Sequence, residues 1–80
     1  MTEHELAILK AVAAAGYRKY KASAQVQAEL KLGPIDFGIA LSSLVSRSLV
    51  RYDSDDDLFV RQEGWSQLQA IRDKKEESSE

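Results

Sequence analysis

The middle of this chain holds a succession of patterns that constrains its fold more than any other feature. Two short helical patterns, at 23–30 and 34–47, are separated by a Gly-Pro pair. Two runs with strand composition follow, at 49–52 and 58–61, with an acidic turn between them. Pro34 suits the first position of a helix, because the N–H that proline lacks would have no helical partner there. The pattern therefore predicts a helix, a tight turn, a second helix and a β-hairpin.

A further helix is predicted at the start of the chain, from Thr2 or Glu3 to Ala15. Thr2 suits the N-cap, and Gly16 supplies the left-handed residue that ends many helices. Apolar residues fall on two opposite sides: Leu6, Leu9, Val12 and Ala13 on one, and Ile8, Ala11 and Ala15 on the other. Burial from two directions would explain this pattern, with the last helix or a second subunit as the second partner. The alternative is that the small residues are simply good helix formers.

The ends and faces of the other helices follow from residue type. Ser23 is predicted to cap the second helix. In the third helix, a buried face centred on Leu41 would include Phe37, Leu44, Val45 and Ser48 at helical spacing. The last helix is predicted from Trp65 to about Lys74. A single domain would thus occupy residues 1–75, followed by a charged, flexible tail at 76–80.

Composition excludes several classes of function. The 80 residues include no cysteine and one histidine, so neither a zinc site nor a histidine-activated nucleophile is expected. Without a phosphate-binding loop either, the sequence predicts neither an enzyme nor a cofactor. The acids Asp53, Asp55 and Asp57 have the spacing that begins a calcium loop, but Leu58 and Gly64 occupy its glycine and glutamate positions. Solvated turn acids are the preferred interpretation, and no metal site is predicted.

Location is predicted from what the sequence lacks. No stretch approaches the roughly 20 apolar residues that a membrane-spanning helix needs. The first residues lack the positive region of a signal peptide. A cytoplasmic protein without membrane contact is expected. Its net charge of −2 gives no overall attraction to nucleic acid, so any such role must depend on local charge.

The chain resembles the winged helix-turn-helix transcription regulators of bacteria and archaea, of the MarR- and PadR-like kind. The resemblance is carried by Leu30, Leu32, Phe37, Ala40, Leu41 and Leu44, by Ser48-Leu49-Val50, and by the run from Val60 to Leu68 around Gly64-Trp65. It implies an α+β fold with a three-helix core, a two- or three-stranded antiparallel wing and a C-terminal helix. It also implies a brief strand at 20–22 that pairs with the hairpin.

The same resemblance implies a small regulator that docks residues 23–47 on double-stranded DNA. The implied phosphate contacts are Lys21, Ser23, Gln25, Lys31, Arg47 and Arg51, and the implied groove contacts are Ser42, Ser43 and Ser46. The alternative is a protein–protein interaction module, with Ile35 and Ile39 as an apolar patch beside an acidic wing. If a second subunit covers the second apolar side of the first helix, the resulting homodimer would present two DNA-reading helices.

Overall fold

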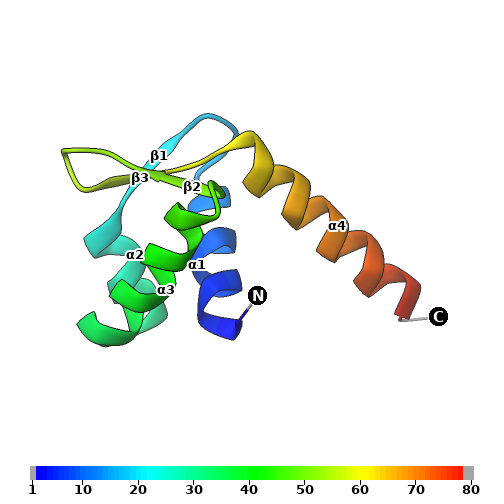
Figure 1. The fold of residues 1–80 in the computed structure, drawn as a ribbon, viewed down its shortest axis with the longest axis horizontal. Coiled ribbons are helices and arrows are strands. Elements are labelled where there is room, and N and C mark those ends of the chain that lie inside the picture. Colours follow the sequence, from blue (N-terminus) through cyan, green and yellow to red (C-terminus); the bar gives the residue numbers. More distant parts are fainter. Residues whose placement is uncertain (1, 79–80) are drawn as a thin grey trace.

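The computed structural model describes the backbone of residues 2–78 and the side chains of residues 2–72. Within this range the chain forms a small α+β fold with four helices and a three-stranded antiparallel sheet (Figure 1). The elements in chain order are α1 (Glu3–Ala13), β1 (Tyr20–Ala22), α2 (Ser23–Leu30), α3 (Pro34–Ser46), β2 (Val50–Tyr52), β3 (Asp57–Val60) and α4 (Gln62–Ser78). The predicted order of elements, including the brief strand before α2, is confirmed.

Helix α1 begins as predicted and ends early. The hydroxyl of Thr2 accepts a hydrogen bond from the backbone N–H of Glu5 at 3.2 Å, which confirms the N-cap. The helix stops at Ala13 and not at Ala15, because the amides of Ala15 and Gly16 bond three residues back and tighten the last turn. Gly16 follows at a φ of 116°, a left-handed conformation that favours glycine.

The predicted cap of α2 is wrong, and the predicted buried face of α3 is confirmed only in part. Ser23 is the first residue of α2, and no side chain caps that helix. In α3, the buried residues are Phe37, Ala40 and Leu44, whereas Val45 is 40% exposed. Burial of Phe37 and Leu44 is as predicted, but the centre of the buried face lies at Ala40, and Leu41 is only partly buried.

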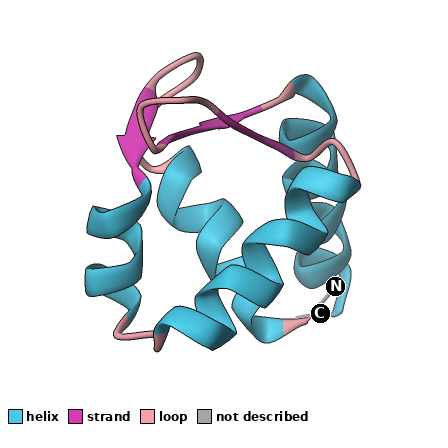
Figure 2. Ribbon diagram, turned by 60° about the vertical axis from the view of Figure 1, so that its left-hand side comes forward, coloured by secondary structure: helices cyan, strands magenta, loops and turns pink. Residues whose placement is uncertain are grey.

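The sheet has the order β1-β3-β2, with both pairs antiparallel. Its inner face carries Val50, Leu58 and Val60, all of which are buried. The sheet lies across the ends of α1, α2 and α3, and no described helix covers its opposite face (Figures 1 and 2). That opposite face, called the outer sheet face below, is therefore open to solvent.

One hydrophobic core joins the helices to the sheet. Its fully buried members include Ile8, Leu9 and Val12 from α1 and Leu44 from α3. Helix α1 contacts α2, α3, α4 and β3, so this chain alone buries it from several directions. Ile8, on the second apolar side of the helix, lies in this core and needs no second subunit to cover it.

Helix α4 begins at Gln62, earlier than the predicted Trp65, and its backbone continues to Ser78. Its first turn packs against the segment between α3 and β2 through Gly64, where an added methyl group would overlap the carbonyl oxygen of Leu49. The predicted flexible tail at 76–80 falls on the end of α4 and on residues outside those described, so it stays a prediction.

Candidate nucleic-acid interface

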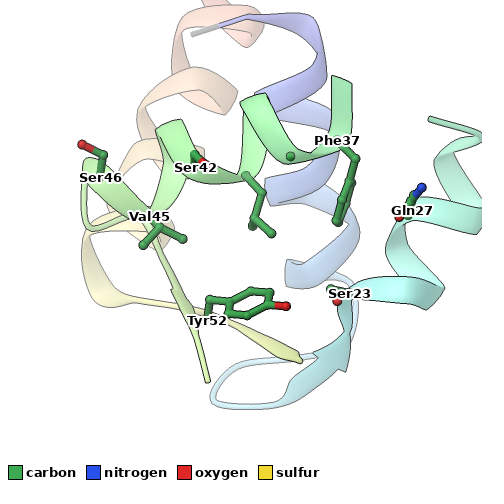
Figure 3. Close-up of a pocket in the computed structure, with 9 residues that line it drawn as sticks. Ser23, Gln27, Phe37, Ser42, Val45, Ser46 and Tyr52 are labelled. Carbon is green, nitrogen blue, oxygen red and sulfur yellow. The ribbon is translucent and has the colours of Figure 1, made fainter. Parts of the chain in front are cut away.

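The outward face of α3 is apolar and lies beside a cleft. Ile35 and Ile39 are 76% and 67% exposed. A cleft of about 630 Å³ separates α3 from β2 and α2 (Figure 3). It is lined by Ser23, Gln27, Phe37, Gly38, Leu41, Ser42, Val45, Ser46 and Tyr52. Three of the predicted DNA contacts, Ser23, Ser42 and Ser46, are thus brought together in a cleft that contains hydroxyl groups and no cation.

Two of the predicted phosphate contacts are held by carboxylates. Lys21 projects from the inner side of β1, and its Nζ lies 2.7 Å from Glu29 Oε1 and 3.4 Å from the Ala11 carbonyl oxygen. Only 15% of the Lys21 side chain is exposed. Arg47 Nη1 lies 3.5 Å from Oε2 of the buried Glu5. Both cations therefore connect elements of this fold, and a phosphate would have to compete with an existing carboxylate for each.

The other predicted contacts are dispersed. Gln25 is exposed, but its side-chain amide donates to Glu29 Oε2 at 3.1 Å. Lys31 is exposed in the turn between α2 and α3, where its φ of 55° ends α2. Ser43 is half-buried on the side of α3 away from the cleft lining. Arg51 is exposed on β2 and belongs to the outer sheet face, opposite to its neighbour Tyr52.

Hydrogen bonds to the carboxylates of Asp53 and Asp56 stabilise the hairpin tip. The Asp53 carboxylate accepts hydrogen bonds from the backbone N–H groups of Asp55 at 2.9 Å and Asp57 at 3.2 Å. The Tyr52 hydroxyl donates to the Asp56 carboxylate, and this bond raises the pKa of Tyr52. Among the described side chains, no cluster of acids or histidine could hold a metal ion. The tip presents negative charge beside the cleft, which opposes approach of a phosphate backbone there.

Several exposed cations and rings lie together on the outer sheet face. The register places Tyr20 on β1, Phe59 on β3 and Arg51 on β2 in one line across the three strands. The Tyr20 and Phe59 ring centroids are 5.0 Å apart with an interplanar angle of 38°. Tyr20 is 50% exposed. Since alternate residues of a strand share a face, Arg61 follows Phe59 on this side.

Two shallow hollows border Phe59. One, of about 390 Å³, is lined by Arg51, Phe59, Arg61, Gln62 and Glu63. The other, of about 480 Å³, is lined by Tyr17, Arg18, Phe59, Val60 and Gln62. The Arg18 guanidinium carbon lies 5.6 Å from the centre of the Tyr17 ring, and the Tyr17 side chain is 63% exposed. The outer sheet face thus combines three arginines with three exposed or half-buried rings.

Acids are present at the edge of this face but bind its arginines weakly. Arg61 Nε lies 3.9 Å from Glu63 Oε2, with both side chains about half exposed. Arg51 makes no ion pair with any described residue. Asp57 lies two residues before Phe59 on the same strand and carries negative charge toward the hairpin tip. Positive charge is therefore concentrated at the end of the sheet nearest Arg18 and Arg61.

The Lys21–Glu29 pair gives a testable pH effect. The hydrogen bond from Lys21 lowers the pKa of Glu29 below its ordinary value. A lowered carboxyl pKa means that the pair stabilises the fold at neutral pH and loses this effect as pH falls through the folded-state pKa. An NMR titration of Glu29 should therefore give a midpoint below that of a model glutamate, and Lys21→Gln should move it upward. An unchanged midpoint in Lys21→Gln would contradict the pairing.

The sequence predicts Arg51 as a phosphate contact but does not group it with the other residues of the outer sheet face. Strand alternation places Phe59 and Arg61 on one side of β3. The pairing of β1 with β3, which brings Tyr20 beside Phe59, depends on a register that the sequence does not encode locally. Arg18 joins the same surface because the loop before β1 places it and Tyr17 at the hollow beside Phe59.

Among the residues described, no helix is both long enough and apolar enough to cross a membrane. No protein-family model, no curated protein and no solved structure matches this chain.

Proposed function

We propose that this chain is a winged helix-turn-helix protein that binds nucleic acid. Two features support the fold assignment: the order of the elements from α1 to α4, and the sheet order β1-β3-β2 with a two-stranded hairpin beside α3. Folds of this kind serve mainly to dock on DNA. A fold supports many functions, however, so the surface must identify the binding face.

The observation that carries the proposal is the separation of charge between the two faces of the sheet. Arg18, Arg51 and Arg61 lie on the outer sheet face, and among the described residues their one ion pair joins Arg61 Nε to Glu63 Oε2 at 3.9 Å. On the α3 side, Lys21 is 15% exposed and paired with Glu29 at 2.7 Å, and Arg47 is 52% exposed and lies 3.5 Å from Glu5. Phosphate contacts dominate the affinity of proteins for nucleic acid. The nucleic acid is therefore assigned to the outer sheet face and not to α3.

The test is a fluorescence-anisotropy titration with a duplex of random sequence at low salt. If three arginines each neutralise one phosphate, the slope of log K against log salt should be about −2.7. The double variant Arg51→Gln/Arg61→Gln should lower the affinity at least about tenfold and make the slope shallower by about 1.8. These residues are exposed, so the thermal stability should change little.

The matched control is Lys10→Gln/Lys31→Gln, which removes the same charge from exposed positions away from the outer sheet face. It should retain nearly all of the affinity. Equal losses in the two double variants would mean that only net charge matters, and would contradict the assigned face. If the unaltered protein bound neither the duplex nor a single strand at low salt, the proposal would end.

A protein partner at α3 is the second candidate function, and the exposure of Ile35 and Ile39 beside the cleft favours it. The two functions are compatible because they use different faces. A photo-crosslinking amino acid at Ser42 would test for a partner in cells. The crosslinks should disappear in Ile39→Asp, while the same change leaves nucleic-acid binding intact; crosslinks that persist in Ile39→Asp would contradict docking at this patch.

A further inference from the structure

We propose that the outer sheet face prefers single-stranded nucleic acid, with bases stacked on Tyr20 and Phe59 and phosphates held by Arg18, Arg51 and Arg61. This inference rests on the proposed nucleic-acid function and specifies the form of the ligand. The aromatic rings of Tyr20 and Phe59 support it, because a protein that bound a duplex only through its phosphates would not need them.

The rings are placed as a stacking surface. Tyr20 and Phe59 face each other across neighbouring strands, with centroids 5.0 Å apart, and form no part of the core cluster. Half of the Tyr20 side chain is exposed, and Tyr17 is 63% exposed at the adjacent hollow. Unpaired bases stack on such rings whatever their sequence, because every base has an aromatic face. A duplex conceals these faces and offers only base edges in its grooves.

The arginines surround the rings at positions suited to a strand backbone. Arg51 lies beside Phe59 in the register of the sheet, and neighbouring strands are about 4.8 Å apart. Arg61 lies on the same hollow as Arg51, and Arg18 lies on the hollow at the other side of Phe59. A strand that crosses β3 at Phe59 would thus meet a guanidinium group on each side. Guanidinium groups bind phosphate oxygens in a bidentate manner.

The acidic residues near the hairpin tip also favour a single strand over a duplex. Asp57 precedes Phe59 by two residues on β3, a separation of about 7 Å. The hairpin tip beyond it carries Asp53, Asp55 and Asp56. A broad duplex laid over the rings would bring many phosphates within the ~10 Å range of these charges. A single strand can pass between Arg18 and Arg61 and remain farther from the tip.

The experiment compares three labelled probes at low salt: a 15-nucleotide strand of dT, a duplex of the same length, and a strand of the same length with abasic sites. We expect the dT strand to bind about tenfold more tightly than the duplex or the abasic strand. Tyr20→Leu/Phe59→Leu, which keeps apolar bulk but removes the rings, should lose about tenfold in affinity for dT only. Tyr52→Leu is the control, because it removes an exposed ring that lies on the inner face of the sheet, away from the proposed binding surface.

The outcomes separate this inference from the proposed function. Equal binding of all three probes, lost in Arg51→Gln/Arg61→Gln but not in the ring variant, would overturn the single-strand preference and leave nucleic-acid binding intact. No binding of any probe would overturn both. A loss in the control equal to that in Tyr20→Leu/Phe59→Leu would also overturn the assignment of stacking to Tyr20 and Phe59.

Discussion

Leu44→Ala is expected to lower the free energy of unfolding by about 3 kcal/mol. Leu44 is fully buried in α3, within the core that joins α3 to α1 and the sheet. Truncation would remove its apolar contacts and leave a cavity that the surrounding helices can fill only in part. A domain of this size has a total stability of roughly 4–12 kcal/mol, so the variant should be close to unfolding at physiological temperature.

Urea denaturation monitored by circular dichroism would measure this effect, with Ile39→Ala as the matched control. Ile39 lies on the same helix but is 67% exposed, so its truncation should change the stability by no more than about 0.5 kcal/mol. Equal losses in the two variants would mean that α3 does not bury the face described above.

Gly64→Ala is expected to lower the free energy of unfolding by about 2 kcal/mol, although alanine is normally the better helix former. Gly64 is buried in the first turn of α4, and an added methyl group would overlap the Leu49 carbonyl oxygen and lie 2.8 Å from Val60 Cγ1. The Leu49 oxygen also accepts the Arg61 N–H at 3.0 Å, so it cannot move without disturbing a second contact. Overpacking of this kind must displace the start of α4 from the sheet.

Gly38→Ala, in contrast, is expected to raise the free energy of unfolding. Gly38 lies in the interior of α3, and a methyl group there would have no neighbour within 4 Å. The variant should therefore gain up to about 1 kcal/mol from helix propensity. Thermal denaturation of the two variants should give shifts of opposite sign, and shifts of the same sign would show that Gly64 is not in close contact with Leu49.

The order of the elements could be predicted because each boundary has a local cause. Thr2 caps α1, Gly16 supplies the left-handed turn, and Pro34 begins α3. The strands were evident from the β-branched and aromatic residues at the two ends of the acidic turn. All of these signals act within a few residues of the element they define.

The packing of α1 and α3 could not be predicted in the same way. Periodicity correctly includes Phe37 and Leu44 in the α3 core face but centres it on Leu41, whereas Ala40 is buried and Leu41 only partly so. A rotation of one residue position is decided by how closely two helices approach, which Ala40 allows and periodicity does not reveal. Ile8 was set apart from the core for the same reason, since a helix packed on several sides has no single buried stripe.

The candidate site was harder still to predict from the sequence, because it depends on contacts between residues that are far apart in the chain. Lys21 and Arg47 are cations in the sequence, but α2 and α1 supply the carboxylates that hold them. Conversely, Arg18, Arg51 and Arg61 come from separate segments and meet on one surface only through the β1-β3-β2 pairing. Composition therefore identified the charged residues, whereas the fold decided which of them face solvent together.

The most direct test of the account is an NMR titration of the ¹⁵N-labelled protein with the short dT strand at low salt. Nucleic-acid binding at the outer sheet face predicts amide shifts concentrated at 18–22, 50–52 and 57–62, with the outward face of α3 at 35–46 nearly unchanged. Shifts concentrated on α3, or no shifts at all, would contradict it.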